Sequence, residues 1–463
     1  MISRRHFLHQ ASMTSLGFMG LHLFACKEPV STSIMAPGYG PLLEDPAKLF
    51  SLPAGFSYKV ISTWGDPMSD GLLTPNRGDG MAAFEGADGK VIIVRNHEVS
   101  TGDVNSGALG KERELLDKIA AESFYDYGKG ETPCLGGTTT LVYNEATGEV
   151  ERSYMSLAGT IRNCAGGPTP WGSWITCEET TERAGQGNNE RDHGFNFEVP
   201  ASADIQRAEP IPLKEMGRFN HEAVCVDPRT GIVYQTEDQG DGMIYRFIPK
   251  EKGKLHMGGK LQALKIKEQT SCDTRNWPIV SGYDFPHQQW MEVEWIDLDN
   301  VESPDDDLRH RGFDLGAAKF ARGEGMWFGD NEAYFACTNG GAKKHGQVFR
   351  YVPSEHEGTA RESEAPGRLQ LFAEPNNSDL LSSCDNLTVA PWGGVFLCED
   401  KSDPRILGLT AEGDVFHFGL NTGHADSELT GVCFSPSGKT MFVNIQHVGL
   451  TFAIQGPWDQ SHV

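Results

Sequence analysis

The sequence feature that most constrains the fold is an internal repeat of short apolar strands separated by turn signals. The clearest copy runs from Glu222 to Asp238: an apolar strand, a Pro/Gly turn, and a second apolar strand that ends in two acidic residues. This pattern predicts a β-hairpin. The other five copies follow the same scheme and begin at Asp79, Cys164, Glu324, Asp385 and Thr430.

Further strands are expected after each hairpin. A third strand with glycine at or near its start follows every copy, for example at residues 242–249 and 346–353. A fourth strand follows five copies, at residues 150–156, 211–216, 261–266, 369–372 and 414–418. The sixth copy has no fourth strand, but an isolated strand at residues 56–61 precedes the first copy. We expect this strand to complete the sixth copy and close the ring, which removes exposed sheet edges.

Six copies of four strands predict an all-β fold, a six-bladed β-propeller over residues 55–458 closed by an N-terminal strand. Two unrelated β-sandwiches would not share this register. Residues 111–124 show apolar residues at helical spacing and predict a short helical insertion. Residues 270–316, rich in Asp, Pro and His, form a long excursion between the third and fourth blades, which we expect to shape a substrate pocket.

The beginning of the chain has the pattern of an export signal. Arg4 and Arg5 precede a stretch without charged residues, 10–25, that is shorter than an ordinary membrane-spanning helix. We predict a twin-arginine signal peptide over residues 1–26 and a linker over 27–54. The twin-arginine export machinery is thus an expected partner. The protein is then periplasmic, or anchored outside the cytoplasm.

The end of this signal allows two kinds of processing. Leu23-Phe24-Ala25-Cys26 resembles a lipoprotein processing site, where Cys26 would become the lipidated first residue. A conventional cleavage near the same place would release a soluble periplasmic protein instead. A single acyl chain gives only marginal membrane binding, so contact with the membrane is expected only through this anchor.

Charge and cysteine content exclude several classes of protein. The formal net charge of -24 argues against a nucleic-acid partner, which requires a basic surface, and fits a solvated surface or a site for cations. The ten cysteines form no CxxC pairs, so neither a zinc knuckle nor a small disulfide scaffold is indicated. We expect most of them to be small core residues. The chain is expected to act as a monomer.

The residues that open the six hairpins are the first candidates for a functional site, because the first strand of each propeller blade faces the central channel. They are Asp79, Cys164, Glu222, Glu324, Asp385 and Thr430. Four carboxylates and a thiol around one axis repel one another unless cations neutralise them, which predicts bound metal. Carboxylate oxygens suit Ca²⁺, whereas a thiolate indicates a transition metal such as iron.

A second layer of candidate ligands lies at the distal ends of the hairpins: His97, Glu98, Glu178, Glu179, Glu237, Asp238, Glu399 and Asp400. The residues of this layer that we predict to bind metal are Glu98, Glu178, Glu237 and Glu399. Solvated strand ends are the alternative interpretation.

Several groups of residues, in their order and spacing, resemble the PhoX family of bacterial alkaline phosphatases. They are Asn96-His97-Glu98, residues 163–167 with 176–179, residues 217–222, Thr236-Glu237-Asp238, and residues 323–325 with 336–339. The resemblance covers nearly the whole chain. It implies a twin-arginine-exported, six-bladed propeller in which iron and calcium ions in the channel hydrolyse phosphate esters outside the cytoplasm.

The resemblance also implies roles for individual residues. The inner metal ligands would be Cys164, Glu222, Glu324 and Asp385, with calcium ligands from the acidic residues around them. The chemistry would be metal-assisted phosphoryl transfer on a small phosphate ester, with Cys164, Glu222, Glu324 and Arg322 as the catalytic set. The side chains that adjoin the channel and could bind phosphate oxygens are Arg162, Arg322 and His97. Salt-bridged structural roles are the alternative for these three residues.

Two other functions stay open at this point. A propeller lactonase that depends on calcium also uses carboxylates at the channel mouth, but it needs no thiolate such as Cys164. A non-catalytic binding propeller of the cell envelope would hold its metal ions for structural reasons alone.

Overall fold

The structure is a computed structural model that describes residues 38–278 and 284–458. The described residues all belong to one compact unit. Arg4, Arg5 and Cys26 lie outside the described residues, so the export signal and the lipidation site stay predictions. Among the described helices, none has the length and apolar character needed to cross a membrane.

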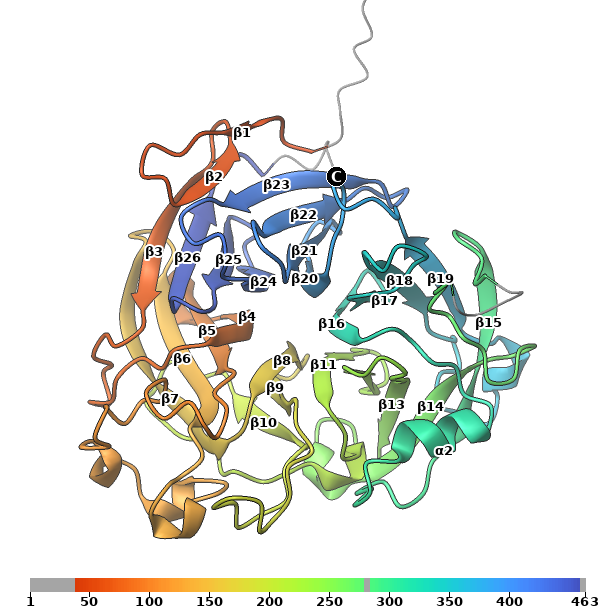
Figure 1. Ribbon diagram of the computed structural model, residues 1–463, viewed down its shortest axis with the longest axis horizontal. Helices are drawn as coiled ribbons and strands as arrows, with labels where there is room; N and C mark the ends of the chain where they lie inside the picture. Colours follow the sequence, from red (N-terminus) through yellow and green to blue (C-terminus); the bar gives the residue numbers. More distant parts are fainter. Residues whose placement is uncertain (1–37, 279–283, 459–463) are drawn as a thin grey trace, which may run out of the picture. The chain divides into compact units, whose positions relative to one another are not determined.

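The unit is built from antiparallel sheets arranged around a central channel, and in each repeat the first strand lies next to the channel and the later strands lie further from it (Figure 1). The first sheet, in chain order, contains β4 (Gly78–Glu85), β5 (Lys90–His97), β6 (Gly136–Asn144) and β7 (Glu149–Thr160). The second contains β8 (Asn163–Pro168), β9 (Ser173–Glu178) and β10 (Asn196–Pro200).

The third sheet has nine strands. One half contains β11 (His221–Val226), β12 (Val233–Glu237), β13 (Ile244–Pro249) and β14 (Gly259–Ile266). The other half contains β16 (Gly323–Gly329), β17 (Glu332–Cys337), β18 (Gln347–Val352) and β19 (Arg368–Ala373). Between the two halves lies β15 (Trp290–Asp297), which pairs with both β14 and β19.

The last two sheets contain both early and late parts of the unit. The fourth contains β20 (Cys384–Val389), β21 (Val395–Glu399), β22 (Arg405–Leu409) and β23 (Val415–Asn421), extended by β2 (Phe50–Pro53) and β1 (Leu42–Leu43). The fifth contains β24 (Leu429–Phe434), β25 (Thr440–Ile445), β26 (Leu450–Gln455) and β3 (Ser57–Thr63). Two strands, β1 and β2, thus lie in the segment that was expected to be a linker.

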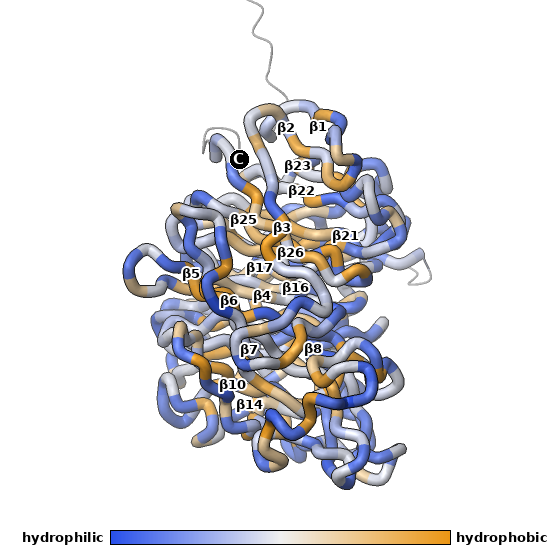
Figure 2. The backbone as a smooth tube through the Cα atoms, turned by 90° about the vertical axis from the view of Figure 1, so that its left-hand side faces the viewer, coloured by the Kyte–Doolittle hydropathy of each residue, from blue (hydrophilic) through white to orange (hydrophobic). Residues whose placement is uncertain are grey.

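The turn between β11 and β12 shows why the sequence folds into hairpins. The carboxylate of Asp227 accepts a hydrogen bond from the backbone N–H of Arg229 at 2.8 Å, and the Asp227 carbonyl accepts one from Gly231 at 2.7 Å. Gly231 has φ +78°, a left-handed conformation that glycine adopts without steric cost. The apolar side chains of the strands are buried between adjacent sheets, and polar residues concentrate in the loops (Figure 2).

Six innermost strands form a closed ring around the channel. In order they are β4, β8, β11, β16, β20 and β24, and each contacts the next (Figure 1). The strand β3 pairs with β26 from Ser57 opposite Gln455 to Thr63 opposite Leu450. The N-terminal strand therefore closes the last sheet, as predicted.

The prediction of six separate blades is confirmed only as an all-β, propeller-like arrangement. Hydrogen bonding joins two groups of four strands through β15 and so defines five sheets among the described residues. The sequence excursion at residues 270–316 contains this bridging strand and α2 (Leu308–Asp314), which is the single α-helix in the described part of the chain.

Two predicted elements are wrong. Residues 111–124 contain 3-10 turns at Leu116–Lys118 and Ala121–Ser123 instead of a helix, because the backbone between these turns is extended. The apolar side chains that suggested a helix pack into a cluster around Leu72. A fourth strand at residues 211–216 is also absent from the second sheet: Ile211 is exposed there, and a 3-10 turn forms at Lys214–Met216.

Candidate metal centre and active site

The inner strands surround a polar cavity of about 200 Å³ on the channel axis. Nine carboxylates, two guanidinium groups, one thiol and one amide line it. The lining residues are Asp79, Glu98, Arg162, Cys164, Glu179, Glu222, Asp238, Arg322, Glu324, Asp385, Asp400, Glu428 and Gln446. The structure therefore brings together every predicted member of the inner ring except Thr430.

A β-bulge in five of the six inner strands turns the ring residue toward the axis. The regular pairing of β11 with β12 is interrupted between His221 and Val224, and Glu222 lies in this interruption. The same interruption surrounds Asp79, Cys164, Glu324 and Asp385 in their strands. Bulges re-aim side chains in this way.

Small residues next to the ring allow neighbouring inner strands to approach closely. A Cβ atom added at Gly325, which follows Glu324, would lie 2.4 Å from the backbone nitrogen of Leu387. At Gly80, which follows Asp79, it would lie 2.6 Å from the Cα of Ala165. Neither position can hold a larger side chain without moving the backbone, and the close approach keeps the cavity narrow.

The second layer is held by one backbone hydrogen bond that recurs in all six repeats. In each, the residue after the second strand donates its N–H to the carbonyl of the residue two positions before the ring residue. The pairs are Glu98 to Arg77, Glu179 to Arg162, Asp238 to Asn220, Thr338 to Arg322, Asp400 to Ser383 and Gln446 to Glu428, at 2.9–3.2 Å. This bond places Glu98, Glu179, Asp238, Asp400 and Gln446 at the cavity.

Three predicted metal ligands of the second layer point away from the cavity and are corrected here. Glu178 accepts hydrogen bonds from the backbone N–H groups of Ile161 and Gly194, both at 2.9 Å. Glu237 accepts the Tyr245 hydroxyl at 2.7 Å. Glu399 forms a two-point ion pair with Arg405, with both distances 2.6 Å. Their carboxylates are therefore occupied in structural contacts.

The side-chain alternation of a strand explains this correction. Successive residues point to opposite sides, so when Glu178 faces outward its neighbour Glu179 faces the axis. The same holds for Glu237 and Asp238, and for Glu399 and Asp400. The sequence shows two acids in a row at these positions and does not reveal which of them faces inward.

His97, predicted to bind phosphate, also lies outside the cavity lining. Its Nδ1 is 2.8 Å from the carbonyl oxygen of Asn76, and its Nε2 is 2.8 Å from the Thr139 hydroxyl. Both ring nitrogens therefore have partners, one just before β4 and one on β6. Its neighbour Glu98 lines the cavity instead.

Glu428 is a cavity residue that the repeat analysis missed. Thr430, which opens the sixth hairpin, donates its hydroxyl to the carbonyl of Gly78 at 2.9 Å and does not line the cavity. Glu428 stands two residues before it, where other repeats carry Arg77, Arg162 and Arg322. An acid at this position, in the one repeat without an acid or cysteine at the ring position, was the sequence signal that could have identified Glu428 as a cavity residue.

Arg162 and Arg322 occupy the more exposed part of the cavity. Their side chains are 38% and 35% exposed, whereas the ring residues are buried. Arg162 pairs with Glu98 at 2.9 Å and also with Glu179. Arg322 binds both oxygens of Asp238 at 2.8 Å. Each guanidinium group is thus held at the mouth by second-layer carboxylates.

The electrostatics of the cavity favour bound cations. With every carboxylate ionised and the Cys164 thiol protonated, nine negative charges face two guanidinium groups, an excess of seven negative charges. Burial, and then the neighbouring carboxylates, raise the pKa values of Asp79, Glu222, Glu324 and Asp385 well above their ordinary range. Burial and the nearby Glu222 likewise raise the pKa of the Cys164 thiol. Cations in the cavity would reverse these shifts.

Two groups of ligand atoms are close enough to hold metal ions. Those of Cys164, Glu179 and Glu222 lie within 4.8 Å of one another, and so do those of Glu222, Glu324 and Asp385. Glu222 belongs to both groups, which places two candidate cation positions side by side. The first group includes a thiol and suits a transition metal, whereas the second offers only carboxylate oxygens and suits a hard cation.

The metal-free protein is expected to lose stability as the pH rises. Burial raises the pKa of Glu179 from 4.5 to about 8. Between these values the folded protein binds more protons than the unfolded chain, so the free energy of unfolding falls with increasing pH. Thermal unfolding of chelator-treated protein between pH 5 and pH 8 tests this. A midpoint that rises over this range would contradict it, and added Ca²⁺ should flatten the dependence.

Comparisons with known proteins find matches over most of the unit. The family model for alkaline phosphatase PhoX matches residues 37–145 and 135–449. Pseudomonas fluorescens PhoX, solved in complex with the transition-state analogue vanadate, shares 17% identity and a TM-score of 0.64, covering 91% of this chain and 98% of that one. A gluconolactonase from Xanthomonas campestris shares 11% identity and a TM-score of 0.40, covering 91% and 98%. No curated protein matches the chain.

The chain combines a propeller-like fold with an acidic cavity on its axis. The family model spans most of its length, and the chain belongs to the alkaline phosphatase PhoX family. It is therefore a phosphoric ester hydrolase, and the family predicted from its motifs is confirmed.

Proposed function

We propose that the chain is an exported phosphatase that hydrolyses phosphate monoesters and uses iron and calcium ions held in its channel. The observation that carries this proposal is the donor set of the cavity, where a buried thiol stands among nine carboxylates with an excess of negative charge. A phosphate ester is an anion and would be repelled by this cavity without cations. Membership of a phosphatase family supplies the reaction class.

The donors divide between two kinds of ion. Cys164, Glu179 and Glu222 would hold iron, because a thiolate favours a transition metal. Glu222, Glu324 and Asp385 would hold the adjacent cation. The oxygen donors that remain for Ca²⁺ are those of Asp79, Glu98, Asp238, Asp400 and Glu428.

The chain's own residues would bind and orient the substrate. When bound, the ions supply Lewis-acid polarisation of the phosphate and activation of an oxygen nucleophile. Arg162 and Arg322 lie at the mouth of the cavity and offer planar donors that match phosphoryl oxygens. Their ion pairs with Glu179 and Asp238 hold the guanidinium groups in place before substrate arrives. Positioning and charge stabilisation are the main contributions to phosphoryl transfer.

The blade count is part of the proposal. We interpret the nine-stranded sheet as two four-stranded blades joined by β15, which gives six blades around the channel. Six inner strands in a closed ring and the sixfold backbone hydrogen bond between the two layers support this interpretation.

Export by the twin-arginine route completes the proposal. Arg4 and Arg5 ahead of an uncharged stretch support this route. The pathway carries folded proteins, so metal could be loaded in the cytoplasm before export. Cys26 would provide a lipid anchor, or cleavage would release the protein into the periplasm. A phosphatase in that compartment would act on small phosphate esters outside the cytoplasm.

Metal removal and reloading test the proposed function. Chelator-treated protein should release no phosphate from an aryl phosphate, and iron together with calcium should restore the activity. Activity restored by calcium alone would overturn the assignment of iron. Turnover of a lactone but not of the aryl phosphate would indicate a propeller lactonase. A gain in thermal stability on reloading, without turnover of either substrate, would indicate a non-catalytic binding propeller.

A further inference from the structure

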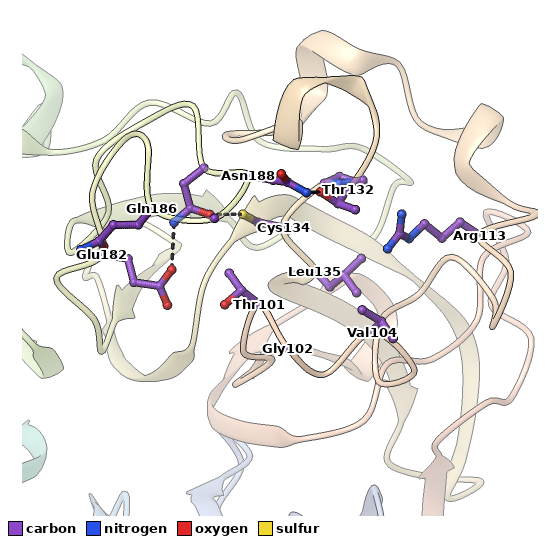
Figure 3. A pocket seen from close by; sticks show the side chains of 13 residues that line it. Thr101, Gly102, Val104, Arg113, Thr132, Cys134, Leu135, Glu182, Gln186 and Asn188 are labelled. Carbon is purple, nitrogen blue, oxygen red and sulfur yellow. Dashed lines mark hydrogen bonds between the residues drawn. The ribbon is translucent and has the colours of Figure 1, made fainter.

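Two loops form a second pocket outside the channel cavity. Residues 98–135 connect β5 with β6, and residues 179–195 connect β9 with β10. They meet where the hydroxyl of Tyr125 donates to the carbonyl of Asp192 at 2.6 Å. The pocket between them has a volume of about 570 Å³, with Cys134 and Glu182 on its wall (Figure 3).

Three potential metal ligands from both loops converge beside this pocket. The ligand atoms of Asp126, Cys134 and His193 lie within 4.8 Å of one another. All three side chains are buried, and those of Asp126 and His193 are fully so. The first two come from the loop before β6, and the third from the loop before β10.

The contacts of His193 have the arrangement seen around metal-binding histidines. Its Nδ1 lies 2.7 Å from Oε1 of Glu178, and its Nε2 faces Oδ2 of Asp126 at 3.3 Å. A carboxylate that accepts the proton of one ring nitrogen fixes the tautomer and leaves the other nitrogen free to bind a metal ion. Glu178, which the channel does not use, therefore has a role here.

The carboxylate of Asp126, like the imidazole of His193, is held in place by several hydrogen bonds. Its Oδ1 accepts the backbone N–H of Gly128 at 2.8 Å, and its Oδ2 accepts those of Glu190 and Arg191 at 2.7 and 2.9 Å. Two of these donors belong to the opposite loop. The Asp126 carboxylate is thus held in position by backbone donors from both loops.

We propose that Asp126, Cys134 and His193 form a second metal site, separate from the channel, that binds a zinc-like divalent ion and joins the two loops. A thiolate, an imidazole and a carboxylate are the donors of Zn²⁺ sites, and a thiolate disfavours Ca²⁺. The fourth ligand would be Oδ1 of Asn189, which lies 3.9 Å from Sγ of Cys134, or a water molecule in the pocket.

Charge supports a cation between these groups. Asp126 and Glu178 are two fully buried carboxylates on either side of one imidazole. The two carboxylates therefore attract a positive charge at Nε2. A proton on the imidazole would neutralise only one of the two carboxylate charges. A divalent ion would neutralise both and would also bind the Cys134 thiolate.

Cobalt binding tests the site without interference from the channel. The background variant is Cys164→Ala, which removes the thiol of the channel. Metal-free Cys164→Ala protein titrated with Co²⁺ should show a thiolate-to-cobalt charge-transfer band in the near ultraviolet. Cys134→Ser in this background should abolish the band, and His193→Gln should abolish it or weaken Co²⁺ binding at least tenfold. Cys272→Ser, which changes another buried cysteine, should leave it unchanged.

Zinc content gives a second measurement on otherwise unaltered protein. One equivalent of Zn²⁺ should be lost on Cys134→Ser or His193→Gln, while the iron and calcium content and the circular dichroism spectrum stay unchanged. The absence of a band in Cys164→Ala, or its persistence in the Cys134→Ser background, would overturn the proposal. His193 would then be an imidazolium that bridges two carboxylates. Phosphatase activity enters neither measurement, so this test is independent of the proposed function.

Discussion

Replacing Cys164 with alanine is expected to abolish both iron binding and phosphate-ester hydrolysis while the propeller stays folded. Cys164 supplies the sole thiol of the described cavity, and its Sγ lies within 4.8 Å of ligand atoms of Glu179 and Glu222. Without it these carboxylates favour hard cations. We expect kcat/KM for an aryl phosphate to fall at least about a thousandfold, which corresponds to about 4 kcal/mol of transition-state stabilisation.

A second buried cysteine provides the control for this experiment. Cys225 lies on β11, an inner strand like that of Cys164, but it packs in the core and does not line the cavity. Cys225→Ala should therefore lower stability without changing the iron content. Iron content and activity, measured on both variants after export by the native signal, decide the outcome. Iron retained in Cys164→Ala would contradict the role of the thiol.

Glu222→Gln is expected to have opposite effects on the metal-free and the metal-loaded protein. Glu222 belongs to both candidate cation groups, so an amide there should weaken both and reduce activity by roughly a thousandfold. In the metal-free protein, burial and then the charge of Glu324 raise the pKa of Glu222, which means that its ionised form opposes folding. Removing this charge should stabilise the metal-free protein by about 1–3 kcal/mol at pH 7.

The matched variant is Glu237→Gln, because Glu237 is equally buried but lies outside the cavity. Its carboxylate accepts the Tyr245 hydroxyl and the backbone N–H of Met243, so the amide should destabilise the protein with or without metal. Denaturant unfolding with and without bound metal, together with metal analysis, measures both variants. If Glu222→Gln destabilises the metal-free protein as Glu237→Gln does, the Glu222 carboxylate is a structural group and not a metal ligand.

The repeat was enough to predict five residues of the inner ring, because the channel-facing position comes at the same place in five of the six hairpins. Asp79, Cys164, Glu222, Glu324 and Asp385 were all found in this way. The second layer was harder to predict, since the inward residue at a strand end depends on its alternation relative to the bulge. Local sequence is nearly the same for Glu178 and Glu179, and only the folded backbone distinguishes them.

Tertiary packing explains the errors in the fold. The segment around Leu116 has helical periodicity, but its apolar side chains are buried equally well when the backbone forms short turns and packs against the cluster that includes Leu72. The strand β15 lies in an excursion rich in Asp, Pro and His, whose composition indicated a loop. It forms because β14 and β19 both offer it an edge. Pairing with such distant partners leaves no local signal in the sequence.

The pairing of β3 with β26 also sets the order in which the cavity can be completed. Asp79 lies on the first inner strand, whereas Glu428 and Gln446, which share the cavity with it, come near the end of the unit. Gln446 donates directly to Asp79 at 2.7 Å. A ribosome must therefore release almost the entire chain before this wall of the cavity exists. Under the proposed function, metal acquisition would follow synthesis, and a truncated chain would lack part of the binding site.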